Sequence, residues 1–413
     1  MPPRSGFARL WLADTISVFG SQVSAVALPL TAVVVLRASV EQVSLTRAIG
    51  AGSMLVAALF AGVVVDRWMR KPILVWSNLG FALVMGSIPA LAFVGGLRIA
   101  ALYIVSAAFN VLSALSIVAS QSFLPELVAK EELARANGKL QTTLSASSVV
   151  GPGAGGWLVE WLGAPLAICL DALTYLIAAI LVASIPVDRS RRALPVSHSP
   201  IFAGIASGAS AVLRHRELRP LAEAIAAHFL FAGLVFSVLI FFANRELGIP
   251  ALGIGALSAS AGAGMVLGSL LAPRMAARRG VGETLVTGSV LVALGVLAFP
   301  LAHGPTWVAC GVLALGQLAF GAGIQIHGIN LVSLRQAIVA PELLGRANAT
   351  FRFLNSGAAT LGALAAAALS SAGLAPRALL AVGAVGFWIP PLVLAHALLL
   401  RRPGSGSGGN APR

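Results

Sequence analysis

The chain has 413 residues, of which 58% are hydrophobic and only 10% are charged, and its mean hydropathy is +0.92. Charged residues make up about a quarter of an ordinary soluble domain, so this composition excludes a protein whose surface faces water. The net charge of +14 is spread along the chain, which argues against a nucleic-acid partner and favours contact with anionic lipid headgroups.

Twelve apolar segments are each long enough to cross the bilayer, because about 20 helical residues span its hydrocarbon core. They lie at 9–36, 42–65, 72–95, 99–122, 139–162, 165–186, 220–243, 252–273, 284–302, 305–332, 347–373 and 377–400. The first is too long for a cleavable signal peptide and is expected to remain as a helix. Barrel strands are excluded because the segments do not alternate apolar with polar residues. The sequence therefore predicts an all-α membrane protein with twelve transmembrane helices.

The basic residues predict how the chain is oriented, since Lys and Arg stay preferentially in cytoplasmic loops. With the N-terminus inside, 23 of the 28 fall in inner segments. The outer side keeps only Arg37, Arg47, Arg98, Arg245 and Arg377. We therefore expect a multi-pass protein of the plasma (inner) membrane with both termini in the cytoplasm.

The longest inner gap divides the predicted helices six and six. Residues 1–186 form an N-terminal bundle, 187–219 a cytoplasmic linker with an interfacial helix, 220–402 a C-terminal bundle and 403–413 a disordered tail. A repeat supports duplication, because Glu131-x-Leu-x-Arg-Ala-Asn137 recurs as Glu342-x-Leu-x-Arg-Ala-Asn348, 211 residues later. Parallel six-helix repeats are typical of alternating-access transporters with a site between the halves.

The inner gap after the second segment reads Gly62-Val-Val-Val-Asp66-Arg67-Trp-Met-Arg70-Lys71. It resembles the signature of the major facilitator superfamily, although Met69 stands where that family often has Gly. The glycine is expected to let a neighbouring helix approach closely. The resemblance implies that Asp66 lies against the positive N-terminal end of the eleventh helix and closes the cytoplasmic side. A positive-inside loop with one compensating acid is the alternative.

The fifth segment contains Gly151-Pro152-Gly-Ala-Gly155-Gly156. Proline removes a backbone hydrogen bond, and Gly151 and Gly155 form a small face that permits tight helix packing. The element resembles the Gly-Pro-x-x-Gly-Gly sequence of proton-exchanging exporters of the superfamily. A packing helix with no bearing on transport direction is the alternative.

Further stretches narrow the resemblance to the branch of enterobactin exporters and macrolide efflux pumps. They are Gln121-Ser-Phe-Leu-Pro-Glu-Leu127, Asp171-Ala-Leu-Thr-Tyr175, Leu213-Arg-His-Arg-Glu-Leu-Arg219 and Arg335-Gln-x5-Glu342-x2-Gly345-Arg-Ala-Asn348. This resemblance implies a proton-coupled exporter of a small organic molecule such as an antibiotic, a siderophore or a related metabolite. An importer of the same fold is the nearest alternative, and a non-transporting sensor or scaffold is a further one.

The resemblance implies that helices 1, 4, 7 and 10 line the central pathway, and these predicted helices carry much of the intramembrane polarity. The candidate lining residues are Ser17, Ser21, Gln22, Asn110, Ser113, His228, Gln325, His327 and Asn330. Polar faces are costly in hydrocarbon, so a hydrated cavity is expected. Polar contacts between helices, and a structural role for either histidine, are the alternatives.

Three acids lie within the predicted spans: Asp14, Asp171 and Glu223. Proton coupling requires a carboxyl group that is buried and exposed in turn, and Asp14, at the head of a polar helical face, is the first candidate. Glu223 ranks second and Asp171 third. The chain contains no nucleotide-binding motif, and the two cysteines fall within spans. We expect no enzymatic activity, no cofactor, no metal and a monomeric protein whose partners are a small substrate, protons and lipid.

Overall fold

The computed structural model describes residues 4–186, 210, 214–215, 218–339 and 341–399. Most of the predicted linker, with its interfacial helix, and the whole tail from 403 lie outside the described residues. Within the described ranges the chain is helical and has no strand.

The N-terminal half contains six long helices. They are α1 (Arg4–Leu30), which continues into the wide π-turn η1 (Thr31–Val35), α2 (Val40–Arg67), α3 (Arg70–Phe93), α4 (Ile99–Leu127), α5 (Leu133–Leu162) and α6 (Ala164–Ala183). The short 3₁₀ turn η2 (Lys130–Glu132) precedes α5.

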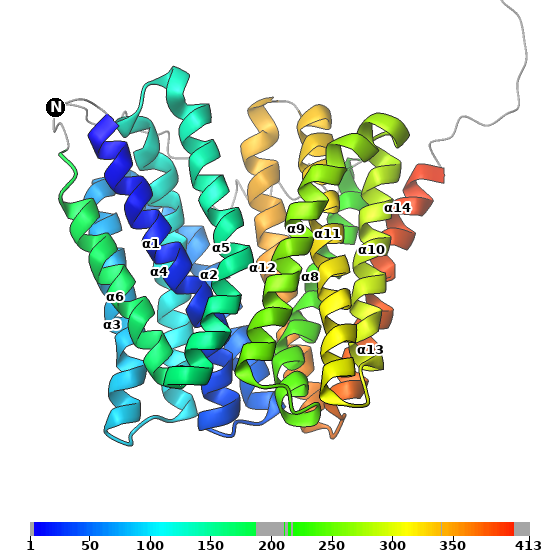
Figure 1. Cartoon of the computed structure of the whole chain (residues 1–413). Helices are drawn as coiled ribbons and strands as arrows, with labels where there is room; N and C mark the ends of the chain where they lie inside the picture. The colour runs from blue at the N-terminus through cyan, green and yellow to red at the C-terminus, as the bar shows by residue number, and fades with distance from the viewer. Residues whose placement is uncertain (1–3, 187–209, 211–213, 216–217, 340, 400–413) are drawn as a thin grey trace, which may run out of the picture.

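The C-terminal half repeats this plan. It comprises α8 (Leu218–Phe241) with the π-turn η3 (Phe242–Glu246), α9 (Ala251–Arg279), α10 (Val281–Leu301), α11 (Thr306–Ile338), α12 (Pro341–Ser371) and a last span divided into α13 (Pro376–Gly386) and α14 (Ile389–Leu399). The fold prediction of twelve helices in two bundles is confirmed, and Figure 1 shows the bundles side by side.

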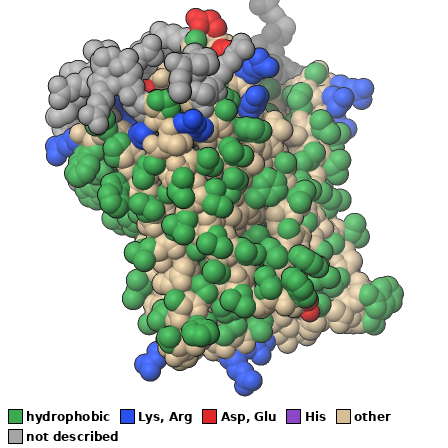
Figure 2. All heavy atoms as spheres, turned by 60° about the vertical axis from the view of Figure 1, so that its left-hand side comes forward, with side chains coloured by type: hydrophobic (Ala, Val, Ile, Leu, Met, Phe, Trp, Pro, Cys, Tyr) green, Lys and Arg blue, Asp and Glu red, His purple; other side chains and the backbone are tan. Residues whose placement is uncertain are grey.

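The surface is that of a membrane protein. Eleven segments are long and apolar enough to cross a membrane, and α5 falls short in composition because its first half is polar. Large apolar side chains are exposed on the outside of the bundles: Leu83, Ile104, Ile180 and Val385 are each 69–76% exposed. Such exposure is unfavourable in water and favourable in lipid. In Figure 2 charged side chains lie at the two ends and hydrophobic side chains cover the middle.

Each half carries the same backbone irregularity at the same register. The turns η1 and η3 begin at Thr31 and Phe242, which are 211 residues apart, the offset of the sequence repeat. Their hydrogen bonds also correspond, since Leu36 N–H donates to Thr31 O and Leu247 N–H to Phe242 O. Positive φ angles follow at Arg37 (50°) and Gly248 (64°). Duplication of a six-helix unit accounts for all of these coincidences.

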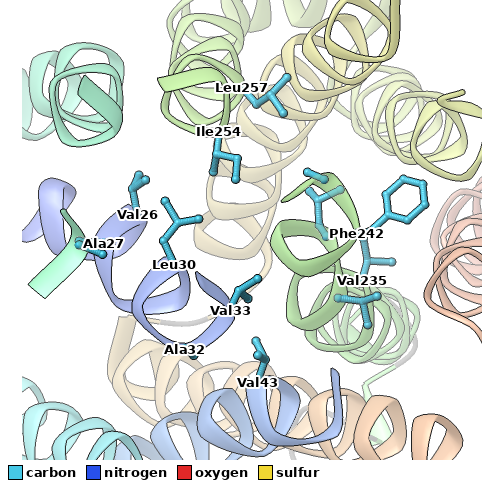
Figure 3. Close-up of a cluster of buried hydrophobic side chains, with 14 of the residues drawn as sticks. Val26, Ala27, Leu30, Ala32, Val33, Val43, Val235, Phe242, Ile254 and Leu257 are labelled. Carbon is cyan, nitrogen blue, oxygen red and sulfur yellow. The ribbon is translucent and has the colours of Figure 1, made fainter. Parts of the chain in front are cut away.

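The two halves pack on each other from one end of the molecule to about the middle of their helices, along α5 and α9 and along α2 and α12. We call the end where α1 begins and α14 ends the terminal end, and the opposite end, with η1 and η3, the far end. One apolar cluster joins both halves toward the far end and includes Val26, Leu30, Val33, Val43, Val235, Phe242 and Ile254. Figure 3 shows side chains from α1, α2, α8 and α9 converging there. Toward the terminal end each half has its own separate apolar cluster within the described residues.

Candidate functional site

A central cavity of about 570 Å³ lies between the halves. Its walls come from α1, α5, α8, α9 and α11, and it is lined by polar and apolar side chains but by no charged one among the described residues. The polar lining consists of four amides and four hydroxyls: Gln22, Gln141, Gln317, Gln325, Ser145, Ser148, Ser258 and Ser269. Phe236, Phe320 and Met265 supply apolar surface. Such a site suits a ligand that combines hydrogen-bonding groups with an apolar body.

A second, more open cavity of about 470 Å³ continues this space toward the terminal end. It lies between α1 and α5, and Asp14 and Asn137 are among its lining residues. Gln141 and Leu144 line both cavities, so their walls are continuous along α5. Together the two cavities extend from Asp14 to Phe236. Beyond Phe236 lies the apolar cluster at the far end, which we call the far-end cluster.

The Gly-Pro-x-x-Gly-Gly element lies where α1, α5 and α9 meet. A Cβ atom on Gly151 would collide with the Gln22 side chain, and one on Gly155 would lie 2.9 Å from Val23 Cα. On the other side, a Cβ on Gly156 would lie 2.6 Å from the Ala251 carbonyl oxygen of α9. Pro152 lines the central cavity. The element thus permits close packing, as predicted, and part of that packing joins the two halves.

The serine face of α1 points into the N-terminal bundle rather than into the cavity. Ser21 Oγ lies 2.7 Å from the Tyr175 hydroxyl, and Ser24 donates a 2.5 Å hydrogen bond to a carboxyl oxygen of Asp171, which is fully buried. Ser17 donates to the Asp14 backbone carbonyl. Helical spacing correctly groups these serines, but α6 takes the face that sequence reasoning assigns to the cavity. Gln22, on the adjacent face, does line it.

The predicted polar face of α4 is also used between helices. Ser106 donates to the Thr46 carbonyl of α2, and Asn110 donates to the Ser106 carbonyl and lies against Gly50 of α2. Ser113 bonds to the Phe109 carbonyl one turn earlier. None of these residues is among those that line either described cavity.

In the C-terminal half, only Gln325 of the predicted lining residues reaches the cavity. His228 and His327 are buried with their rings 6.2 Å apart, and His327 shares a 2.7 Å hydrogen bond with Ser289. Asn330 donates to the Ile326 carbonyl. These three are held inside the bundle of α8, α10 and α11. Glu223 is 45% exposed at the start of α8 and pairs with Arg219 at 2.8 Å.

The loop with the superfamily signature makes no described contact with the other half. A Cβ on Gly62 would meet open space, so the close approach expected there does not occur in this conformation. Arg67 is exposed, and Arg70 pairs with Glu126 of α4 within its own half. The side chain of Asp66 lies outside the described residues. The halves diverge at this end, which leaves Gly62 without a neighbouring helix.

Sequence reasoning missed Arg47, which it counts with the outer charges. The structure places Arg47 within α2, seven residues past its first residue and about 10 Å along the helix. Its guanidinium lies 6.0 Å from the centroid of the Phe236 ring, which belongs to the other half. The sequence does contain a signal for this residue, because Arg47 falls inside the predicted span 42–65. A charged residue inside a membrane span is a candidate functional residue by default.

Two six-helix bundles around a central cavity define a membrane protein of the transporter class. Residues 10–363 match the family model of the Major Facilitator Superfamily. The chain therefore belongs to this family, whose members are membrane transporters rather than enzymes.

Its curated relatives are distant. The chain is 25% identical over 380 residues to the enterobactin exporter EntS of Salmonella typhimurium. This alignment covers 87% of this chain and 86% of that protein. It is 29% identical to the uncharacterized MFS-type transporter YceJ of Bacillus subtilis, and this match spans 60% of each chain.

Solved structures share the fold at low identity. A point mutant of the nucleoside transporter NupG superposes with a TM-score of 0.76 at 13% identity and covers 95% of this chain and 99% of its own. The inward-facing structure of a bacterial homologue of the iron transporter ferroportin superposes with a TM-score of 0.74 at 17% identity. The match covers 96% of this chain and 99% of that chain. The outward-facing state gives 0.59, also at 17% identity, covering 95% and 99%.

Proposed function

We propose that this protein is a proton-coupled exporter of a small organic molecule, located in the plasma (inner) membrane with both termini in the cytoplasm. The observation that carries the proposal is the pair of continuous cavities, which run from Asp14 at the terminal end to Phe236 and stop at the far-end apolar cluster. With the termini in the cytoplasm, this is an inward-facing state. Alternating access then requires the far-end cluster to open as the terminal end closes.

Two further observations support the inward-facing interpretation. Most of the Lys and Arg residues that the structure describes belong to segments at the terminal end, as expected for its cytoplasmic side. The fold is also more similar to the inward-facing than to the outward-facing ferroportin homologue, with TM-scores of 0.74 and 0.59.

Export is the direction that the sequence favours. The similarity to an enterobactin exporter covers most of the chain, and the Gly-Pro-x-x-Gly-Gly element is typical of proton-exchanging exporters in this family. The element also has a mechanical role that suits alternating access, since it lies where α1 and α5 of one half pack on α9 of the other. The likeness to NupG and the ferroportin homologue concerns the fold alone and does not favour import.

Asp14 is the acid best placed to couple protons to transport. It lines the cavity at the terminal end, whereas Asp171 is sealed between α1 and α6 and Glu223 is paired on the surface. A carboxyl group at the mouth of the pathway can take up a proton when the pathway is open. Closure of the terminal end would bury the group and favour its neutral form. Substrate and proton would then occupy the pathway alternately.

The test uses everted membrane vesicles from an efflux-deficient host that expresses the protein. A susceptibility panel first selects a compound to which expression gives resistance. Energised vesicles are expected to accumulate this compound, a protonophore to abolish the accumulation, and Asp14→Asn to reduce it at least tenfold because the proton site is lost. Glu223→Gln is the matched control and should transport like the wild type.

Three results would contradict the proposal in different ways. Accumulation that persists with the protonophore removes proton coupling. Asp14→Asn vesicles that behave like the wild type remove the coupling role of Asp14. Uptake into right-side-out vesicles in place of everted ones identifies an importer.

A further inference from the structure

The face of α2 that carries Arg47 looks into the space between the halves. Val43, one turn earlier, belongs to the far-end cluster, and Figure 3 shows it pointing from α2 toward Val33. Residues four apart share a helical face, so Arg47 lies directly beside this cluster on its terminal side. The flanking faces of α2 are occupied by other helices, with Gly50 against α4 and Gly52 against Thr360 of α12.

Arg47 is an exposed guanidinium within a membrane span and has no acidic partner among the described residues. Its one described interaction is the 6.0 Å cation–π contact with Phe236, at the outer limit of such contacts. A cation inside a membrane is costly and is retained where it faces water, a counter-charge or a substrate. The contact with Phe236, a cavity-lining residue, places Arg47 at the edge of the central cavity.

The rest of the cavity supplies complementary groups but no negative charge. Phe236 and Phe320 line it with their ring centroids 4.9 Å apart and form an aromatic wall. Gln317, also in the lining, is only 7% exposed, and its Oε1 atom has no hydrogen-bond partner among the described residues. A buried acceptor without a partner is unfavourable, and a ligand hydroxyl or N–H group would satisfy it.

We propose that the transported molecule is an organic anion with an aromatic or similarly apolar body and at least one hydrogen-bond donor. Its carboxylate or equivalent anionic group binds Arg47, its body packs on Phe236 and Phe320, and its donor binds Gln317. This inference rests on the proposed function and names the substrate class of the same cavity. A cationic drug is disfavoured because the described lining of the central cavity offers it no carboxylate, and Asp14 lines only the second cavity.

The test compares acids with their own amides, so that charge is the only large difference within each pair. The probes are salicylate and salicylamide, 3-hydroxy-2-naphthoate and 3-hydroxy-2-naphthamide, and 4-hydroxycinnamate and its amide. Affinities come from ligand-dependent thermal unfolding of the purified, full-length protein in detergent. Wild-type protein is expected to bind the acids more tightly than the amides.

Arg47→Gln should weaken acid binding about tenfold or more, the effect of losing one charged hydrogen bond, and leave amide binding nearly unchanged. Arg47→Lys should keep part of the preference for acids. Arg98→Gln removes an exposed cation at the far end of the same half and should bind like the wild type. The unfolding curve of each variant without ligand shows whether it is folded.

Equal or tighter binding of the amides by wild-type protein would overturn the proposal, and so would the absence of binding by every acid. A preference for acids that survives in Arg47→Gln would overturn the role of Arg47. These outcomes are separate from the proposed function, because equilibrium binding needs no gradient. A protein that binds the acids but transports nothing contradicts the exporter, whereas one that exports only neutral or cationic compounds contradicts the anion.

Discussion

Arg245 Nη2 donates a 2.5 Å hydrogen bond to the backbone carbonyl oxygen of Val33, 212 residues earlier in the chain. Val33 belongs to η1 and Arg245 to η3, so the two equivalent wide turns of the duplicated halves contact each other. Both turns depart from the α-helical hydrogen-bond pattern, and wide turns of this kind often occur at functional sites. The bond holds the halves together at the far end, beside the apolar cluster that closes it.

Removing this bond should loosen the far end. Arg245→Ala is expected to raise the open population about tenfold, because a charged hydrogen bond contributes about 1.5–3 kcal/mol. The measurement is the labelling rate of Leu30→Cys, in a background without Cys169 and Cys310, by a membrane-impermeant maleimide. Leu30 is fully buried in the cluster, so labelling reports opening. Arg98→Ala is the control, and an unchanged rate in Arg245→Ala would show that the bond does not hold the halves.

A methyl group at Gly156 should prevent the halves from meeting. The added Cβ would lie 2.6 Å from the Ala251 carbonyl oxygen and 2.8 Å from Gly255 Cα, and neither backbone can yield as a side chain would. Gly156→Ala is expected to expose the far end in the same labelling assay and to cost about 1–3 kcal/mol of stability. Gly311→Ala, where a Cβ would meet open space, should leave both unchanged. Equal behaviour of the two variants would show that this packing tolerates a methyl group.

Ser24 should contribute more than Thr174 to holding the buried Asp171 carboxyl group. Ser24 donates at 2.5 Å, whereas Thr174 donates at 3.2 Å and also bonds the Asp171 backbone carbonyl. Ser24→Ala is expected to lower the free energy of unfolding by about 1–3 kcal/mol, because it leaves a buried acceptor unsatisfied. Thr174→Val should cost less. Thermal unfolding of both variants decides the matter, and a greater loss in Thr174→Val would reverse the assignment.

The two positive-φ positions after the wide turns make a matched pair. Arg37 adopts φ 50° and Gly248 adopts φ 64°, and a side chain in this region costs about 1–2 kcal/mol. Arg37→Gly should therefore raise the unfolding temperature, and Gly248→Ala should lower it. The prediction fails if Arg37→Gly is destabilising, which would mean that the Arg37 side chain itself contributes to stability.

Hydropathy and charge suffice to predict the membrane class and the fold of twelve helices in two bundles. Even α5, which is too polar for an unambiguous span, is found because its glycine- and proline-containing second half is apolar. The wide turns leave no such signal, since Thr31-Ala-Val-Val-Val35 and Phe242-Ala-Asn-Arg-Glu246 share only their alanine. Their conformation depends on tertiary packing at the far end.

The site is harder to predict than the fold. Spacing places Ser17, Ser21 and Ser24 on one face of α1, but it cannot say that Tyr175 and Asp171 of α6 lie opposite that face. Gln22 and Gln325 are recovered, and Gln141 and Gln317 are not, because α5 was not expected to line the pathway and Gln317 lies two turns from the polar stretch near Gln325. Which face of a helix meets a cavity is decided by its neighbours.

The position equivalent to Arg245 in the first half is Val34, which is 51% exposed and offers no donor. Two identical ancestral units related by a dyad would form the bond between their wide turns twice or not at all. The present chain forms it once, from the side chain of one unit to the main chain of the other. At this contact the two repeats are no longer equivalent, because one supplies the side-chain donor and the other supplies the backbone acceptor.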